Sequence, residues 1–84
     1  MKSIAVVDAD IMTYDILSGY IKNLFPFDDL KIDDYSDSIE FCDAISDNII
    51  YDMAFIDVST PDYSGLEAAD MLRKSGKHTL LIFM

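Results

Sequence analysis

Continuous apolar runs mark most of the strands that this sequence predicts. Residues 4–7, 53–56 and 79–84 are almost entirely apolar, which favours strands covered on both faces, as in parallel sheets. Residues 30–35 begin with alternating apolar and charged side chains, which indicates a half-exposed strand. Because charges on a strand commonly protect the edge of a sheet, we expect this strand at an edge.

Three stretches between these strands have apolar residues at helical spacing. The first covers residues 11–25, with Asp10 as its predicted N-cap, and the second covers residues 38–47. The third begins at residues 64–65 and ends at Gly76, which suits a C-cap because it lacks a side chain. The inward side of the first helix is predicted to consist of Tyr14, Leu17, Tyr20, Ile21, Leu24 and Phe25.

Strands and helices therefore alternate along the chain. Such alternation predicts a single α/β domain over residues 1–84, with a parallel sheet, right-handed crossovers and helices on both faces. Two acids directly follow apolar strands, Asp8 after residues 4–7 and Asp57 after residues 53–56. If those strands are neighbours, the two carboxylates meet at the carboxyl edge of the sheet, where open α/β sheets bind ligands.

Charge and composition narrow the functional classes. The 84 residues carry a net charge of -10, so the chain is expected to repel nucleic-acid backbones and to attract Mg²⁺ or a basic partner surface. Most of the acids are expected to solvate loops and helix starts. No targeting segment is recognisable, and no apolar run approaches the roughly 18 residues of a membrane helix. Together with a single cysteine, Cys42, this predicts a soluble, cytoplasmic protein without membrane association.

Two segments of the chain resemble the receiver domain of two-component response regulators. They are residues 4–10, IAVVDAD, and residues 52–72, DMAFIDVSTPDYSGLEAADML. The resemblance implies a flavodoxin-like parallel sheet with strand order 2-1-3-4, in agreement with an edge position for residues 30–35. It also implies a signalling module rather than an enzyme, with a histidine kinase or a phosphotransfer protein as its partner.

By position, the resemblance makes Asp57 the phospho-acceptor. Asp8 and the backbone carbonyl of Ser59 would hold Mg²⁺ together with Asp57, and Pro61 and Gly65 belong to the same signature. The chemistry agrees with this implication. A carboxylate is repelled by an anionic phosphoryl group unless a cation such as Mg²⁺ neutralises the charge.

Two features depart from the pattern of the family. Most receivers have a second acid directly after the first, whereas this chain has Ala9. The affinity for Mg²⁺ is therefore expected to fall unless Asp10, one position later, turns toward the ion as a further ligand. The chain also ends at Met84, before the hydroxyl residue and the later lysine of the family. We therefore expect a receiver that is truncated after its fourth strand.

In a domain truncated in this way, the strand at residues 79–84 forms the second edge of the sheet. An apolar edge is a site for pairing with another chain. The sequence therefore predicts a homodimer, most simply a two-fold one through the exposed edge of this strand.

Two other functions fit parts of the sequence. A pseudo-receiver would keep the fold as a protein-interaction module without phosphorylation, and Ala9 is the reason to consider it. Residues 6–10, VVDAD, also resemble the Asp-x-Asp start of haloacid-dehalogenase-type phosphatases. That family has Thr or Val at the position of Met12, and it needs later Lys and Asp motifs that a chain of this length cannot hold.

Overall fold

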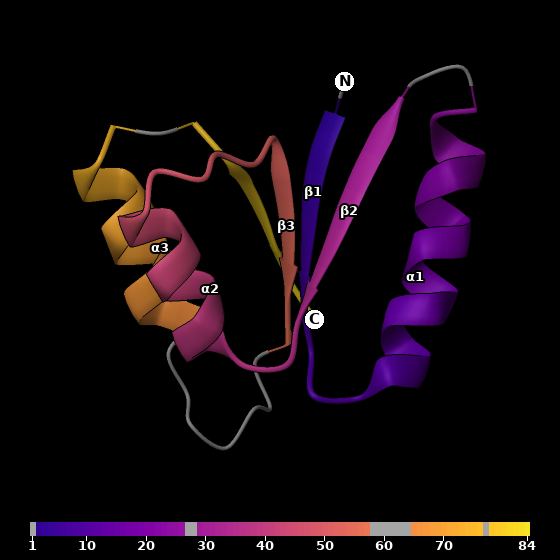
Figure 1. Cartoon of the computed structure of the whole chain (residues 1–84), viewed down its shortest axis with the longest axis horizontal. Helices are drawn as coiled ribbons and strands as arrows, with labels where there is room; N and C mark the ends of the chain where they lie inside the picture. Colours follow the sequence, from indigo (N-terminus) through magenta and orange to yellow (C-terminus); the bar gives the residue numbers. More distant parts are fainter. Residues whose placement is uncertain (1, 27–28, 58–64, 77) are drawn as a thin grey trace.

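The computed structural model describes residues 2–26, 29–57, 65–76 and 78–84, which form one parallel sheet with helices on both faces (Figure 1). The strands are β1 (Lys2–Val7), β2 (Leu30–Tyr35), β3 (Met53–Ile56) and β4 (Leu80–Phe83). The helices are α1 (Ile11–Leu24), α2 (Ser38–Ser46) and α3 (Gly65–Lys74). The sheet order is β2-β1-β3-β4, so the predicted α/β fold of flavodoxin-like type is confirmed.

β1 is the central strand of the fold. It pairs in parallel with β2 through Ile4 and Ile32 and with β3 through Ile4 and Met53. The run Ile4 to Val7 is almost completely buried, because it has strands on both sides and helices over both faces. This is the environment that a continuous apolar run predicts. β2, with its charged residues, lies at the edge, also as predicted.

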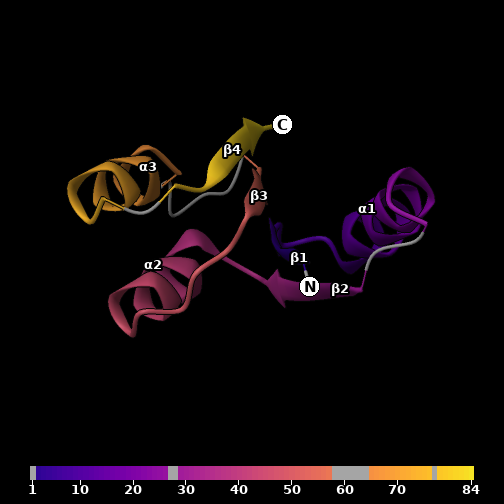
Figure 2. The same ribbon diagram turned by 90° about the horizontal axis from the view of Figure 1, so that it is seen from above.

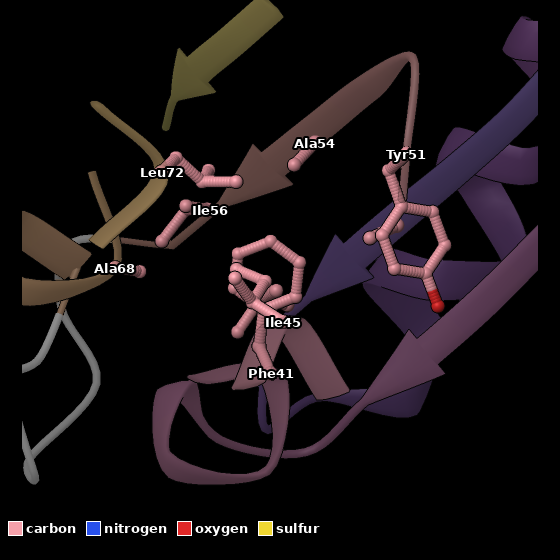
Figure 3. Packing of buried hydrophobic residues seen from close by; sticks show 9 residues of the cluster. Phe41, Ile45, Tyr51, Ala54, Ile56, Ala68 and Leu72 are labelled. Atoms are coloured by element: carbon pink, nitrogen blue, oxygen red, sulfur yellow. The ribbon is translucent and has the colours of Figure 1, made fainter. Parts of the chain in front are cut away.

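The larger core lies between the sheet and the two helices α2 and α3 (Figure 3). Small side chains of the sheet, such as Ala5 and Ala54, leave room for the large ring of Phe41 from α2. The other buried members are Val7, Ile45, Tyr51, Ile56, Ala68 and Leu72. Alternate residues of β1 and β3 thus face this core, as the two-residue period of a strand requires.

The opposite face of the sheet packs against α1 alone among the described helices. Ile21 of α1 is buried against Ile4 and Val6, and the half-buried Tyr14, Leu17 and Phe25 pack around this contact. The prediction that Tyr20 and Leu24 also belong to the inward side is wrong, because they are 65% and 70% exposed.

The reason for this difference is the angular position of each residue on the helix. With 3.6 residues per turn, Tyr14, Leu17, Ile21 and Phe25 fall within one narrow stripe. Tyr20 and Leu24 lie on the neighbouring row of residues spaced by four, which turns away from the sheet. An apolar residue at helical spacing can therefore flank a stripe without being part of it.

Capping residues mark the helix termini, with Asp10 and Gly76 at the positions that the sequence predicts. Asp10 caps α1, because its Oδ1 accepts a hydrogen bond of 2.9 Å from the backbone N–H of Met12. Asp37 caps α2 in the same way, with a 2.8 Å bond from the N–H of Glu40. After α3, Gly76 adopts a φ of +73°, a left-handed conformation that suits glycine.

A hydrogen-bonded pair of tyrosines ties the edge strand to the core. The hydroxyl of Tyr51 donates to Oδ2 of Asp33 at 2.6 Å and also shares a hydrogen bond with the hydroxyl of Tyr35. Burial, followed by these two hydrogen bonds, raises the pKa of Tyr51 above its ordinary value, so its hydroxyl stays protonated at neutral pH. The described residues include no helix that is both long and apolar enough to cross a membrane.

Candidate functional site

Two carboxylates predicted to act together follow neighbouring strands at the same edge of the sheet. Val7, the last residue of β1, is in register with Ile56, the last residue of β3. The backbone N–H of Asp57 donates a 2.9 Å hydrogen bond to the carbonyl of Val7. Asp8 and Asp57 therefore occupy adjacent backbone positions at the carboxyl ends of β1 and β3, where ligands bind in open α/β sheets.

Asp8 is held in place by two neighbouring elements. Its backbone N–H donates to the carbonyl of Tyr35 at the end of β2, at 3.0 Å. Its Oδ1 accepts a 2.8 Å hydrogen bond from the backbone N–H of Asp10, just before α1. Only 8% of Asp8 is exposed, so the carboxylate is fixed in a largely water-excluded position. Electrostatic interactions with any bound ion are strong in such a position.

Asp57 is half-buried and directly follows the fully buried Ile56. In a strand, alternate residues face the same side, and this places Asp57 on the side of Phe55 and Asp8 on the side of Val6. Both of these residues belong to the core that packs against α1. The two acids therefore share one face as well as one edge of the sheet.

Asp34 is a third acid at this edge, and the sequence analysis did not include it in the site. It lies next to the end of β2, in register with Val6 of β1. Its pKa is raised, first by burial and then by the negative charge of Asp8, with smaller contributions from Glu40 and Asp15. The sequence position of Asp34 could have placed it in the site, because an acid near the end of a strand that pairs in parallel with β1 must approach Asp8.

Asp10 takes a structural role in the described fold. Its side chain is exposed and its Oδ1 serves as the cap of α1, so acting as a metal ligand would compete with the cap. Ala9, at the position where receivers commonly have an acid, is exposed. Ser59 and Pro61 lie outside the described residues, and Gly65 is the first residue of α3.

The chemistry of the paired acids suits a hard divalent cation. Within the described ranges, no group of three or more His, Cys, Asp or Glu side chains is placed to hold a metal ion. Mg²⁺ does not need such a group, because it is commonly bound by one or two carboxylates and keeps several water molecules. Asp8 and Asp57 provide two oxygen-bearing side chains of this kind, whereas soft metals would prefer thiolates.

A shallow pocket at the other end of the two helices has a different character. It lies between the C-terminal ends of α2 and α3 and is lined by Ile45, Ser46, Asn48, Met71, Lys74 and Ser75. The ammonium group of Lys74 forms a 2.8 Å ion pair with Asp70 one turn earlier in α3. Helices in this fold run opposite to the strands, so the pocket is remote from Asp8 and Asp57.

Comparison with known proteins does not assign the chain to a family. No protein-family model matches the chain, and no curated protein matches it significantly.

Proposed function

We propose that the chain is a receiver module in which Asp57 accepts a phosphoryl group from a histidine kinase or a phosphotransfer protein. The observation that supports this proposal best is the hydrogen bond from the N–H of Asp57 to the carbonyl of Val7. It fixes the acceptor beside Asp8, at the edge of the sheet where α/β proteins bind their ligands.

The proposed reaction is a transfer between two side chains. A carboxylate oxygen of Asp57 attacks the phosphorus of a phosphorylated histidine whose other ring nitrogen carries a proton. The P–N bond breaks, its electron pair stays on the histidine nitrogen, and the histidine leaves as a neutral imidazole that keeps this proton. The product on this chain is an acyl phosphate on Asp57. Asp57 is half-buried rather than fully buried, as a residue that reacts with a second protein must be.

Negative charge is the main obstacle to this reaction. Asp8 follows the strand next to the acceptor, Asp34 adds a negative charge close to Asp8, and an incoming phosphoryl group adds further negative charge. Asp8, Asp57 and the backbone carbonyl of Ser59 would hold Mg²⁺, which neutralises this charge when bound. Asp8 is buried and accepts a hydrogen bond from the N–H of Asp10, so its carboxylate is already held in one position at this edge before an ion binds.

A phosphoryl donor with a P–N bond tests the proposal directly. The chain is incubated with phosphoramidate and Mg²⁺, and the intact protein is analysed by mass spectrometry. One phosphoryl adduct that hydroxylamine removes is expected, because hydroxylamine cleaves acyl phosphates. The Asp57→Asn variant is expected to lack it. Asp29→Asn, which changes an exposed acid at the opposite end of the sheet, is expected to keep it.

The same experiment addresses the alternative of a pseudo-receiver. Ala9 and the capping role of Asp10 favour this alternative, because together they remove the second acid of the usual ion site. A pseudo-receiver would give no adduct with phosphoramidate. Its tyrosine fluorescence, which is readable because the chain has five Tyr and no Trp, would not respond to Mg²⁺.

The proposal gives the chain a signalling role without catalytic turnover of its own, because each Asp57 stores a single phosphoryl group. We place this role in the cytoplasm, since the single cysteine of the chain suits a reducing compartment. A net charge of -10 makes nucleic acid an unfavourable partner for this domain.

A further inference from the structure

The two faces of the sheet are covered unequally. α2 and α3 together cover one face, whereas α1, the single described helix on the other face, lies beside β1 and β2 (Figure 2). The hydroxyl of Tyr14 in α1 donates to the carbonyl of Ile32 in β2, which anchors the helix toward this edge. On the same face, β3 and β4 present four apolar side chains, which we call the shelf: Met53, Phe55, Leu80 and Ile82. Leu80 is 58% exposed, and the other three are half-buried.

The exposed side of α1 carries a second apolar surface. Four residues spaced by four positions form a continuous row, which we call the ridge: Met12, Ile16, Tyr20 and Leu24. They are between 57% and 70% exposed. Residues at this spacing are neighbours on one side of a helix. The ridge is therefore a coherent apolar surface rather than a set of scattered side chains.

The ridge and the shelf lie on the same side of the sheet. α1 packs against the face to which Met53 and Phe55 belong. Because α1 lies beside β1 and β2 (Figure 2), it stands above the neighbouring surface of β3 and β4. Ridge and shelf thus belong to one step, a raised helix beside a lower sheet surface.

We propose that a second copy of this chain covers the step, in a two-fold dimer in which α1 of each copy lies on the shelf of the other. A two-fold interface requires a surface that is complementary to itself. A raised helix next to a lower apolar sheet surface meets this requirement, because each copy provides both the helix and the surface.

The step carries large apolar side chains that a dimer could bury. The four ridge residues and Leu80 are between 57% and 70% exposed. A standard interface buries roughly 800 Å² of each partner. A monomeric protein rarely leaves a large contiguous apolar patch uncovered.

The distribution of charge favours a second copy over a basic partner. The chain carries a net charge of -10, yet α1 contains just one acid, Asp15, and one base, Lys22. β3 and β4 contain no charged residue. Two acidic copies can therefore meet here without bringing acids together, whereas a basic partner would be drawn to the acidic edge around Asp8.

Pairing of β4 edges, the arrangement that the sequence predicts, would leave the ridge and the shelf exposed. The two arrangements can be separated because the N–H groups of Leu80 and Met84 donate to the β3 side, at 3.0 Å and 2.9 Å. Since N–H directions alternate along a strand, the N–H of Phe83 points to the open edge of β4. Phe83→Pro removes this edge donor and leaves the pairing with β3 intact.

The test is the mass of the full chain and its variants, measured by size-exclusion chromatography with light scattering over a concentration series. The unchanged chain is expected at twice its 9.5 kDa. Ile16→Glu and, separately, Tyr20→Glu are expected at the monomer mass with an unchanged circular dichroism spectrum, because both side chains are exposed in one copy. Ile50→Glu, a matched change at an exposed apolar residue away from the step, is expected to stay dimeric. Phe83→Pro is also expected to stay dimeric.

Three outcomes would overturn the proposal: a monomeric unchanged chain, a dimer that persists in both glutamate variants, or a dimer that is lost in Phe83→Pro but not in Ile16→Glu. The last of these would assign the dimer to the β4 edge. Asp57 directly follows β3 and is neither a ridge nor a shelf residue. The proposed dimer can therefore be tested separately from the phosphoryl transfer proposed above. Asp57→Asn is therefore expected to remain dimeric even though it loses phosphorylation.

Discussion

The hydroxyl of Tyr51 donates a 2.6 Å hydrogen bond to Asp33, joining the residue that leads into β3 to the edge strand β2. β1 lies between these two strands, so the bond spans the centre of the sheet. The ring of Tyr51 also packs edge-on against Tyr35, with 6.1 Å between the ring centres. The edge strand is therefore fixed by a side-chain bridge in addition to its backbone pairing with β1.

Removing this bridge is expected to destabilise the chain without changing the fold. Tyr51→Phe keeps the buried ring but deprives Asp33 and Tyr35 of their partner, and we expect a loss of about 1–2 kcal/mol in the free energy of unfolding. Urea unfolding followed by circular dichroism measures it. Tyr20→Phe serves as the control, since Tyr20 is exposed, and a change within about 0.5 kcal/mol is expected there. Equal effects of the two substitutions would show that the bridge contributes nothing.

The charge of Asp34 is expected to reduce stability at neutral pH. Burial and the charge of Asp8 raise the pKa of Asp34 in the folded chain above its ordinary value of 3.8, so the folded state holds the proton more tightly than the unfolded state. Below pH 3.8 Asp34 is mostly protonated in both the folded and the unfolded state, so it does not reduce the stability of the fold there. As the pH rises through the raised pKa the stability falls, and the full loss is present at pH 7.

Asp34→Asn removes this loss. The variant is expected to be more stable than the unchanged chain at pH 7, by less than about 1 kcal/mol because Asp34 is exposed and solvent screens its charge. The difference should shrink toward zero below pH 3.8. Thermal unfolding at a series of pH values, with Asp29→Asn as the matched control, provides the measurement. A constant difference at all pH values would contradict an electrostatic origin.

Magnesium is expected to stabilise the chain through Asp8 and Asp57. A ligand that binds the folded state at ten times its dissociation constant adds about 1.4 kcal/mol to the free energy of unfolding. A rise of the melting temperature with increasing MgCl₂ is expected for the unchanged chain and for Asp29→Asn. It is expected to be lost or much reduced in Asp8→Asn and in Asp57→Asn. The same rise in all four proteins would indicate binding elsewhere, and Ca²⁺ and K⁺ serve as ion controls.

Two glycines are expected to respond in opposite directions to the same substitution. Gly76 has a φ of +73°, where a side chain is strained, and Gly76→Ala is expected to cost about 1 kcal/mol or more. Gly19 lies within α1 with open space around it, and Gly19→Ala is expected to gain about 0.5–1 kcal/mol. Urea unfolding of both variants tests this. Destabilisation by Gly19→Ala would contradict the open surroundings of this position.

The order of the elements was predictable because each local signal agreed with the fold. The apolar runs form strands, Asp10 caps α1, and residues 30–35 with their charged start form an edge strand. The meeting of β1 and β3 at one edge followed from the resemblance and from the rules for parallel sheets. These features depend on neighbouring residues or on general rules for parallel sheets, so they can be predicted from the sequence.

Features that depend on long-range packing were not predictable in this way. The outward turn of Tyr20 and Leu24 depends on how α1 is rotated against the sheet, which helical spacing alone does not determine. The raised pKa of Asp34 depends on the register of β2 against β1. The bond between Tyr51 and Asp33 joins residues from different elements and leaves no local pattern in the sequence.

The central place of β1 in the sheet also affects how the chain folds during synthesis. β1 leaves the ribosome first, but its second neighbour β3 is complete only at Ile56. Until then β1, whose residues Ile4 to Val7 are fully buried in the complete fold, has one open side, and α1 has only half a sheet to pack on. Because parallel neighbours far apart in the sequence pair slowly, the nascent chain is most exposed to aggregation in this interval. Substitutions that weaken the β1–β3 contact are therefore expected to reduce the yield of folded protein in cells more than substitutions of similar cost in β2.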